Sequence, residues 1–164
     1  EARVSAADMI GGPGEGWALA MTVVSHEREP AELGYTARYS KSVKQLESTV
    51  RAEPERFEAH QAIAVARAFV ESEMLRLHVR RRLSERLDGL THGPEGSIDK
   101  LLMITVEQAV GHAALAVAGS DAVLDPDDTW LKVYLYSRAQ SVMGGTSQIQ
   151  KNIIATRILG LPTS

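Results

Sequence analysis

The chain contains no cysteine among its 164 residues. This absence excludes disulfides, thiolate metal sites and thiol nucleophiles together, and it is compatible with the reducing cytoplasm, where we expect the protein to reside. The net charge is only −3, so neither nucleic acid nor an anionic membrane is expected as a main partner. Runs of about 18 apolar residues are also missing, which argues against a membrane-spanning segment.

The beginning of the chain lacks the features of a complete N-terminus. The first five residues contain no initiating Met and do not follow the basic-then-apolar order of a signal peptide. A loop-like composition continues as far as Gly16. We therefore expect residues 1–16 to be a connector from a missing N-terminal region, and residues 17–164 to form one domain of sufficient size to bury a core.

Helical periodicity dominates the rest of the sequence, and alternating strand patterns are nearly absent. Within residues 54–90, apolar side chains recur three and four positions apart, which predicts one apolar stripe on a helix: Ile63, Ala66, Val70, Met74 and Leu77. The same period continues over residues 98–113, whose Ala-rich end would allow close approach of a neighbouring helix. The pattern predicts an all-α bundle.

Two segments leave their local structure open or interrupted. Pro30 lies inside the first helical segment, residues 15–50, and predicts a bend or break near residues 27–32. Residues 130–136 read equally well as a short strand or as a helix that follows the Asp-Pro-Asp-Asp start signal.

The charged and titratable residues do not indicate a metal site. The sequence His-Glu-Arg-Glu-Pro at residues 26–30 is not the two-His zinc motif, because Pro30 stands where the second His is required. The spacing of the other histidines does not bring ligands together, so we predict no metal. The arginines of residues 76–86 are interspersed with Glu71, Glu73 and Glu85 and lack neighbouring aromatics, which favours a solvated helix face over nucleic-acid binding.

The sequence Gly-Gly-Thr-Ser-Gln-Ile-Gln at residues 144–150 predicts a sharp turn into a helix. Gly144 and Gly145 can take positive φ, and Ser147 with Gln150 has the spacing of a capping box. Free N–H groups and the positive end of the helix dipole suit a phosphate. An ordinary capped helix without a ligand fits the same pattern.

Residues 144–162 resemble, nearly residue for residue, the C-terminal signature of acyl-CoA dehydrogenases. Further similarity lies at residues 14–17, 26–28, 60–63 and 96–102, in the order of the family and over almost the whole chain. The resemblance implies the C-terminal helical domain, an up-and-down bundle of four to five helices. In the family, a helical domain and a β-domain precede it, and the connector at residues 1–16 would arrive from that β-domain.

The resemblance also implies a reaction and its partners. Family members dehydrogenate an acyl-CoA thioester between the α- and β-carbons with FAD, and pass electrons to an electron-transfer flavoprotein or similar acceptor. Gly145, Thr146 and Gln148 match cofactor-binding positions. Members commonly assemble as dimers of dimers through this domain, so a homo- or hetero-tetramer is expected.

The position of the catalytic base departs from the common family pattern. Many members carry a Glu directly before the Gly-Thr of the signature, whereas this chain has Gly144. Other members carry the base directly before an Arg on the first helix of the domain. That position matches Glu27, and Arg28 would then orient the CoA. Alternatively, Glu27 lies on a solvated helix face without a catalytic role.

Two further FAD-binding elements of the family are not intact. Residues 51–57 replace an Arg-x-x-Phe-Gly element, and residues 116–122 replace a Gln-x-x-Gly-Gly-x-Gly element. Two main hypotheses follow: an active FAD-dependent dehydrogenase that uses Glu27, or a structural subunit of a heteromeric complex that removes no proton itself. A third is a generic helical interaction domain that has no link to a flavin. In either case we expect the isolated chain to be inactive, because the flavin and substrate sites are shared with absent domains.

Overall fold

The computed structural model describes residues 3–26, 31–90, 93–125 and 127–162, and over these ranges the chain is helical with no strand. The elements in chain order are η1 (Ala6–Asp8), α1 (Gly16–His26), α2 (Ala31–Ala52), η2 (Pro54–Arg56), α3 (Ala59–Leu87), α4 (Gly96–Ala118), α5 (Ser120–Leu124), α6 (Thr129–Ala139), α7 (Ser147–Ile153) and the π-helical turn η3 (Ile154–Ile158). The all-α prediction is confirmed, with more and shorter helices than the four to five expected.

The structure decides the secondary structure of residues 130–136, which the sequence left open between strand and helix. The stretch around Trp130 is helix α6, and the Asp128 carboxylate caps it by accepting from the Leu131 N–H at 2.8 Å. The predicted interruption near Pro30 falls on residues 27–30, outside the described residues. The described helices on either side, α1 and α2, are separate elements.

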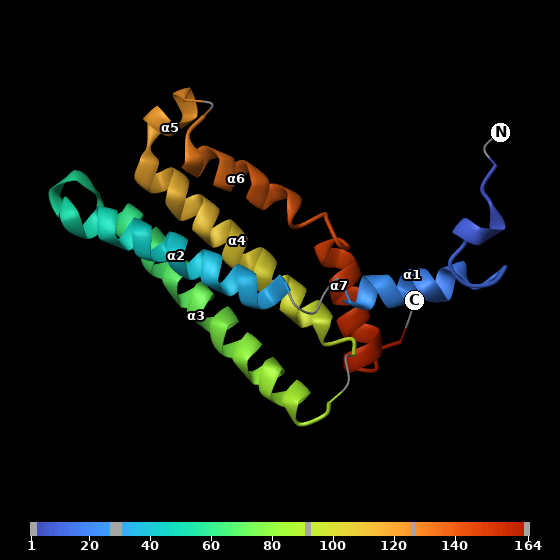
Figure 1. The fold of residues 1–164 in the computed structure, drawn as a ribbon. Coiled ribbons are helices and arrows are strands. Elements are labelled where there is room, and N and C mark those ends of the chain that lie inside the picture. Colours follow the sequence, from blue (N-terminus) through green and yellow to red (C-terminus); the bar gives the residue numbers. More distant parts are fainter. Residues whose placement is uncertain (1–2, 27–30, 91–92, 126, 163–164) are drawn as a thin grey trace.

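The core forms where α2, α3 and α6 pack around α4 (Figure 1). Its buried side chains come mainly from three helices: Tyr39, Val43 and Leu46 of α2, Val65, Ala68, Leu75 and Val79 of α3, and Met103, Val106, Val110, Ala113, Ala114 and Val117 of α4. By length and composition α4 alone among the described helices could cross a membrane, yet half of its most apolar window is buried inside the bundle. Its apolar character is therefore explained by its central position.

Close packing of α4 against α6 depends on Gly111. A Cβ at this position would lie 2.9 Å from Ser137 Oγ and 3.2 Å from the Tyr134 Cα. Such distances leave no room for a side chain. The prediction that small residues at this end of α4 admit a neighbouring helix is confirmed.

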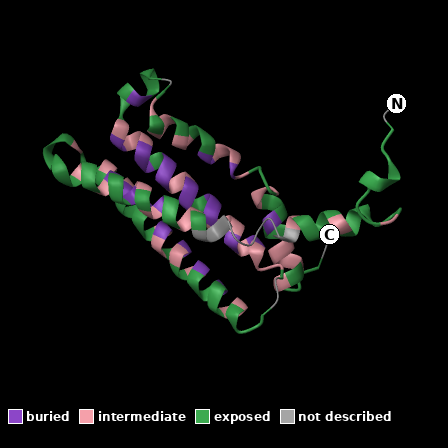
Figure 2. Cartoon of the chain, viewed as in Figure 1, coloured by how far each residue is buried: buried purple, intermediate pink, exposed green. Residues whose placement is uncertain are grey.

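The apolar stripe predicted on α3 lies on the side of the helix that faces away from the core. Ile63, Val70, Met74 and Leu77 are 66%, 54%, 52% and 57% exposed, and Ala66 is exposed as well. The buried face is instead formed by residues 65, 68, 72, 75, 79 and 82. Figure 2 shows α3 with buried positions on its inner side and exposed ones outside. The predicted stripe is therefore present, but α3 carries a second stripe, and this second stripe is the buried one.

The buried face of α3 also corrects the interpretation of its basic run. Arg82 is buried and donates to Glu85 at 2.6 Å, and its Nε lies 3.8 Å from the buried Asp99 carboxylate of α4. His78 Nε2 contacts the other Asp99 oxygen at 2.5 Å. The run is therefore not a uniformly solvated face, because Arg82 belongs to a buried polar contact between α3 and α4.

Helix α1 extends beyond the end of the bundle (Figure 1). Its large apolar side chains Trp17, Met21 and Val23 are all exposed. A helix of 11 residues with a mainly apolar composition does not stand alone in water at low cost. This helix is therefore a second apolar surface of the chain, distinct from the outer face of α3.

Candidate functional site

The turn before α7 is held from inside by a side chain of that helix. Gly144 and Gly145 have φ of 63° and 96°, which favours glycine at both positions. Gln150 is fully buried, and its Nε2 donates to the carbonyls of Gly144 at 3.1 Å and Gly145 at 3.3 Å. A Cβ on Gly145 would lie only 2.6 Å from that nitrogen. The turn therefore needs glycine at both positions, and it needs the Gln150 amide to bond the two glycine carbonyls.

The helix cap differs from the predicted capping box. Thr146 is the N-cap, and its hydroxyl accepts from the Ile149 N–H at 3.3 Å. Ser147 is already the first helical residue, and its N–H donates to the Ser141 carbonyl at 3.3 Å. The predicted Ser147–Gln150 box is therefore wrong, because the cap lies one residue earlier than that box requires and Gln150 turns back to the glycines.

Four backbone donors remain open at this turn. In the described part of the chain, the N–H groups of Gly144, Gly145, Thr146 and Gln148 have no hydrogen-bond acceptor. Gly145, Thr146 and Gln148 are the residues predicted to bind the cofactor. Gly145 and Thr146 are half-buried and Gln148 is exposed. The turn can thus present several N–H donors to one acceptor-rich ligand.

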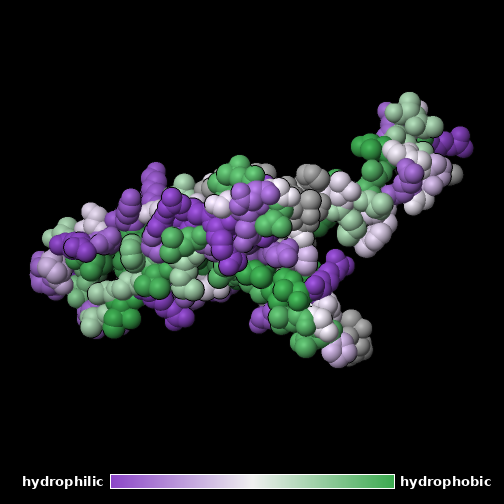
Figure 3. Space-filling model, turned by 90° about the horizontal axis from the view of Figure 1, so that it is seen from below, coloured by the Kyte–Doolittle hydropathy of each residue, from purple (hydrophilic) through white to green (hydrophobic). Residues whose placement is uncertain are grey.

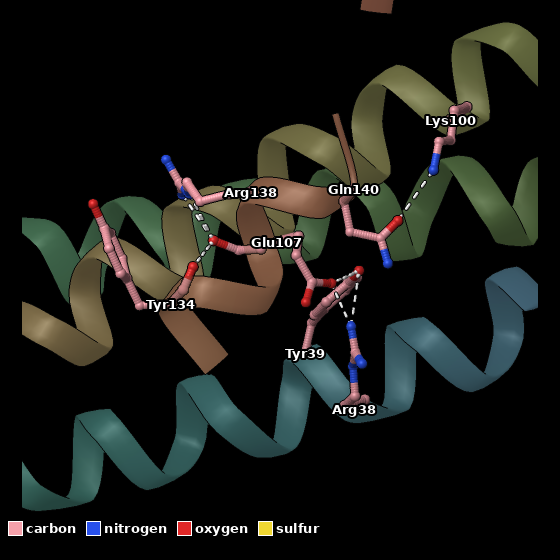
Figure 4. A network of polar contacts seen from close by, with 8 residues as sticks. Arg38, Tyr39, Lys100, Glu107, Tyr134, Arg138 and Gln140 are labelled. Atoms are coloured by element: carbon pink, nitrogen blue, oxygen red, sulfur yellow. Dashed lines mark hydrogen bonds and ion pairs between the residues drawn. The ribbon is translucent and has the colours of Figure 1, made fainter. Parts of the chain in front are cut away.

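A lysine from α4 lies over Gly144. Lys100 Nζ donates to Gln140 Oε1 at 3.1 Å, as Figure 4 shows. A Cβ on Gly144 would lie 3.8 Å from the same nitrogen. A cation therefore stands beside the position where many members of the family carry their carboxylate base.

A buried carboxylate joins α2 and α4 within the core. Glu107 is buried, and it accepts hydrogen bonds from the Tyr39 hydroxyl and the Arg38 guanidinium (Figure 4). Arg38 also lies over the rings of Tyr35 and Tyr39, at 4.8 and 5.1 Å from their centroids. Sequence reasoning missed this cluster, although a lone acidic residue within the apolar stretch of α4 was a usable signal.

The network shifts the pKa values of two of its members. Burial raises the pKa of Tyr39 far above its ordinary value of 10.0, and the hydrogen bond to the Glu107 carboxylate raises it further. Burial is the largest single influence and would lower the pKa of Arg38, but the attraction of Glu107 together with the interactions with Tyr39 outweighs it, so the net shift is upward. Tyr39 therefore stays a neutral donor and Arg38 a cation at any ordinary pH.

The predicted base and its neighbour cannot be placed. Glu27 and Arg28 lie outside the described residues, as do Glu29 and Pro30. Their roles therefore remain predictions. Within the described ranges, no three His, Asp or Glu side chains are grouped closely enough to hold a metal ion.

The two weakened FAD elements lie within the described residues. The first includes η2, where Arg56 pairs with Glu53 at 3.3 Å and both side chains are largely exposed. The second spans the end of α4 and the start of α5, where Gly119 has a φ of 72°. One positive-φ glycine thus remains where the family element has a glycine-rich turn.

Comparison with known proteins gives the class of the chain. The model of the family described as acyl-CoA dehydrogenase, C-terminal domain, matches residues 14–159. The chain therefore belongs to the acyl-CoA dehydrogenase family and forms its helical C-terminal domain, in agreement with the fold and the Gly144–Gly145 turn.

Individual relatives refine this assignment. The chain is 29% identical to acyl-CoA dehydrogenase IpdE1 of Mycobacterium tuberculosis (strain ATCC 25618 / H37Rv) and 30% identical to IpdE1 of Mycolicibacterium smegmatis (strain ATCC 700084 / mc(2)155). In each case 99% of the chain is covered, but only 42% and 41% of the relative. The solved structure of the Tcur3481-Tcur3483 steroid ACAD has a similar fold, with a TM-score of 0.72 at 18% identity, over 98% of this chain and 44% of that one. The chain thus spans about two fifths of the length of these proteins.

Proposed function

We propose that the chain is the helical C-terminal part of an FAD-dependent acyl-CoA dehydrogenase that oxidises the Cα–Cβ bond of an acyl-CoA thioester. The observation that carries this proposal is the turn at Gly144 and Gly145, tied by Gln150 and bearing open N–H donors. Membership of the family supports it. The acceptor of the electrons would be an electron-transfer flavoprotein or a similar carrier.

The residues present at this turn fit a flavin cofactor. The open N–H groups of Gly145, Thr146 and Gln148 point to an acceptor-rich partner, and FAD offers ring carbonyls and a diphosphate. The side chain of Thr146 is occupied with capping, so its contribution would come from the backbone. When bound, the flavin accepts the hydride that leaves the β-carbon of the substrate.

Proton removal is assigned to Glu27. Gly144 has no group that can take a proton, so the α-proton of the substrate must go to a carboxylate elsewhere. Glu27 matches the alternative base position of the family, and enclosure in an apolar acyl site would raise the pKa of such a carboxyl toward the working pH. Arg28 would orient the CoA portion.

A structural subunit of a heteromeric dehydrogenase is the second candidate. Lys100 stands beside Gly144, and two FAD elements are weakened, both of which suit a chain that completes the site of a partner. The fold neighbour Tcur3481-Tcur3483 carries two gene products in its name. In this case the base and most flavin contacts would come from the partner chain.

The decisive experiment uses the whole protein, purified alone and together with any chain that co-purifies with it. Absorbance near the flavin bands is measured before and after addition of straight-chain, branched and steroid-side-chain acyl-CoAs. We expect bound flavin that bleaches with one class of substrate. Glu27→Gln should abolish bleaching and retain the flavin, whereas the matched variant Glu29→Gln should behave like the parent protein.

Three outcomes would change the assignment. Unchanged turnover in Glu27→Gln would remove Glu27 from the mechanism. A protein that holds flavin and turns over only in the presence of a second chain, regardless of Glu27, would favour the structural subunit. A preparation without flavin under all conditions would contradict both candidates.

A further inference from the structure

A pocket opens between α2, α4 and α6. Its lining residues come from these helices and from the segment just before α6, so it is separate from the turn before α7. Its volume is about 510 Å³, within the range of about 300–1,000 Å³ that is typical of small-molecule sites. Glu107 and Val110 of α4 are buried and therefore lie at its inner end, whereas Lys132 and Tyr136 of α6 are exposed beside its entrance. It is called the Glu107 pocket below.

The Glu107 carboxylate has one oxygen occupied and one oxygen open. Oε2 accepts from both Tyr39 and Arg38, and Figure 4 shows both contacts on that oxygen. Oε1 accepts no hydrogen bond within the described part of the chain, and it is not among the side-chain atoms that are enclosed without a partner. The Glu107 side chain is only 4% exposed, so Oε1 meets a donor through the pocket that it lines. An open charged acceptor at a buried position favours a ligand that brings a donor.

The other walls of the pocket are mainly apolar. Val110 is buried, Val133 is half-buried and Tyr136 is 46% exposed. Apolar contact alone selects poorly between partners, and on the face in Figure 3 hydrophobic side chains lie among hydrophilic ones along the bundle. The Glu107 pocket differs because a single charged acceptor lies at the end of its apolar walls, which fixes the orientation of a ligand as well as its chemistry.

The charges around the pocket are already balanced. Arg38 pairs with Glu107 at the inner end and is a cation at any ordinary pH. Lys132 Nζ pairs with the Asp127 carboxylate at 2.9 Å beside the entrance. A cationic ligand would therefore meet Arg38 and Lys132, and an anionic ligand would meet Glu107. This pattern favours an uncharged ligand.

We infer that the Glu107 pocket binds a small uncharged molecule whose hydroxyl group donates to Glu107 Oε1 and whose apolar, ring-sized body lies against Val110, Val133 and Tyr136. A hydroxyl that projects from a ring can reach the inner end while the ring itself stays between the apolar walls. Binding makes and breaks no covalent bond. The site goes beyond the proposed function and does not depend on it.

The test uses the whole protein and four probes that share a benzene ring. Benzyl alcohol can donate and accept a hydrogen bond, acetophenone can only accept, toluene can do neither, and benzylamine is a cation at neutral pH. Affinities are measured by ligand-observed NMR and calorimetric titration. We expect benzyl alcohol to bind about tenfold more tightly than each of the other three, because it alone gives a charged acceptor an uncharged donor. Equal binding of toluene, or tighter binding of benzylamine, would overturn the proposal.

Glu107→Gln reverses the hydrogen-bonding character of the pocket. The amide oxygen of this variant must face Tyr39 and Arg38, because both are donors, so its NH₂ group faces the pocket. The pocket then presents a donor in place of an acceptor. The preference for benzyl alcohol over acetophenone should fall from about tenfold to about onefold or below. An unchanged preference would contradict the contact with Glu107.

Ser42→Phe locates the site without altering Glu107. Ser42 lies on the α2 wall of the pocket and is half-buried, so the larger ring would occupy the space of the ligand. Binding of benzyl alcohol should be lost, while circular dichroism stays that of the parent protein. The matched control is Ser48→Phe, which is on the same helix, exposed and outside the pocket, and which should bind like the parent protein. Unchanged binding in Ser42→Phe would place the probe elsewhere and contradict the proposal.

The longer polypeptide supplies one further outcome. If none of the four probes binds the whole protein, the Glu107 pocket is not available to small molecules, and the proposal is wrong. All of these measurements record binding of uncharged or charged ring compounds and none records flavin or turnover. They therefore fail or succeed separately from the proposed function.

Discussion

Gly144 and Lys100 together define the chemistry available at the signature turn. The glycine removes the carboxylate that many family members carry there, and the ammonium lies close to the space that a side chain would enter. A carboxylate placed at this position would be paired at once with a cation, which favours its ionised form and weakens it as a base.

Because Lys100 lies beside Gly144, we expect that a glutamate placed at residue 144 does not by itself restore activity. In the whole protein, Gly144→Glu should not restore turnover to Glu27→Gln, because Lys100 would hold the new carboxylate and a φ of 63° strains any side chain. Adding Lys100→Met should recover part of the rate. The measurement is steady-state turnover with the best acyl-CoA. Full rescue by Gly144→Glu alone would contradict the proposed role of Lys100.

The buried Glu107 predicts a clear stability difference between two substitutions. Glu107→Ala should lower the free energy of unfolding by about 2–3 kcal/mol, because the buried Tyr39 hydroxyl loses its acceptor and Arg38 its counter-ion. Arg38 is 45% exposed, so water compensates for part of the loss. Glu107→Gln keeps an acceptor and should cost less. Urea unfolding followed by circular dichroism compares them, and equal losses would show that hydrogen bonding is not the cause.

The raised pKa of Tyr39 predicts that the folded chain loses stability at alkaline pH. Its pKa is raised in the folded chain, so the folded state keeps the proton while the unfolded state releases it above about pH 10. Its contribution is therefore complete below that pH and declines as the pH rises further. Tyr39→Phe lacks this ionisation, so its free energy of unfolding should fall less between about pH 8 and about pH 11. Parallel curves for the two proteins would argue against a raised pKa.

At the scale of the helices, the contact between α4 and α6 depends on glycine, which has no side chain, at position 111. Gly111→Ala should destabilise the chain by about 1–3 kcal/mol, because the new methyl group meets Ser137 and the backbone of Tyr134. A Cβ on Gly34, in α2, would instead meet no neighbouring atom within 4 Å. Gly34→Ala should therefore stabilise by about 0.5–1 kcal/mol through helix propensity. Thermal unfolding of both variants checks the pair, and the same sign for both would refute this account of packing.

The helices themselves could be predicted from periodicity, but the orientation of α3 could not. Its sequence contains one apolar line through Val70 and another through Leu75, and the second includes Ser72 and Arg82. Hydrophobicity alone would favour the first line as the buried one, but in the structure that line is exposed. Only the partners of the second line on α4, including Asp99 for Arg82, show why a more polar face is the buried one.

The sequence predicts which segment forms the candidate site, but it does not predict which residues contact one another there. Glycines, hydroxyl side chains and amides at residues 144–150 indicate a capped helix start, yet Thr146 and Ser147 are equally suited to the cap. The choice depends on where the buried Gln150 side chain points, and tertiary packing decides that. Lys100 and Gln140 come from other parts of the chain, and no local sequence pattern indicates that they meet beside Gly144.

At the scale of the whole molecule, two of the apolar surfaces in the described part of the chain lie in different places. The outer face of α3, with Ile63, Val70 and Leu77, lies along the bundle, whereas α1 carries Trp17 and Met21 beyond its end (Figure 1). The relatives that match this chain are more than twice its length. Because the two surfaces are separate, a contact formed at one of them would not compete with a contact formed at the other.

The bond from Gln150 to the two glycine carbonyls has a thermodynamic consequence for ligand binding. Because the turn is tied to its own helix, its backbone is ordered before any ligand arrives. Binding then does not have to order those residues, which would cost about 1–2 kcal/mol for each residue fixed. If the turn binds the cofactor as proposed, Gln150 would therefore strengthen affinity through preorganisation, without touching the ligand.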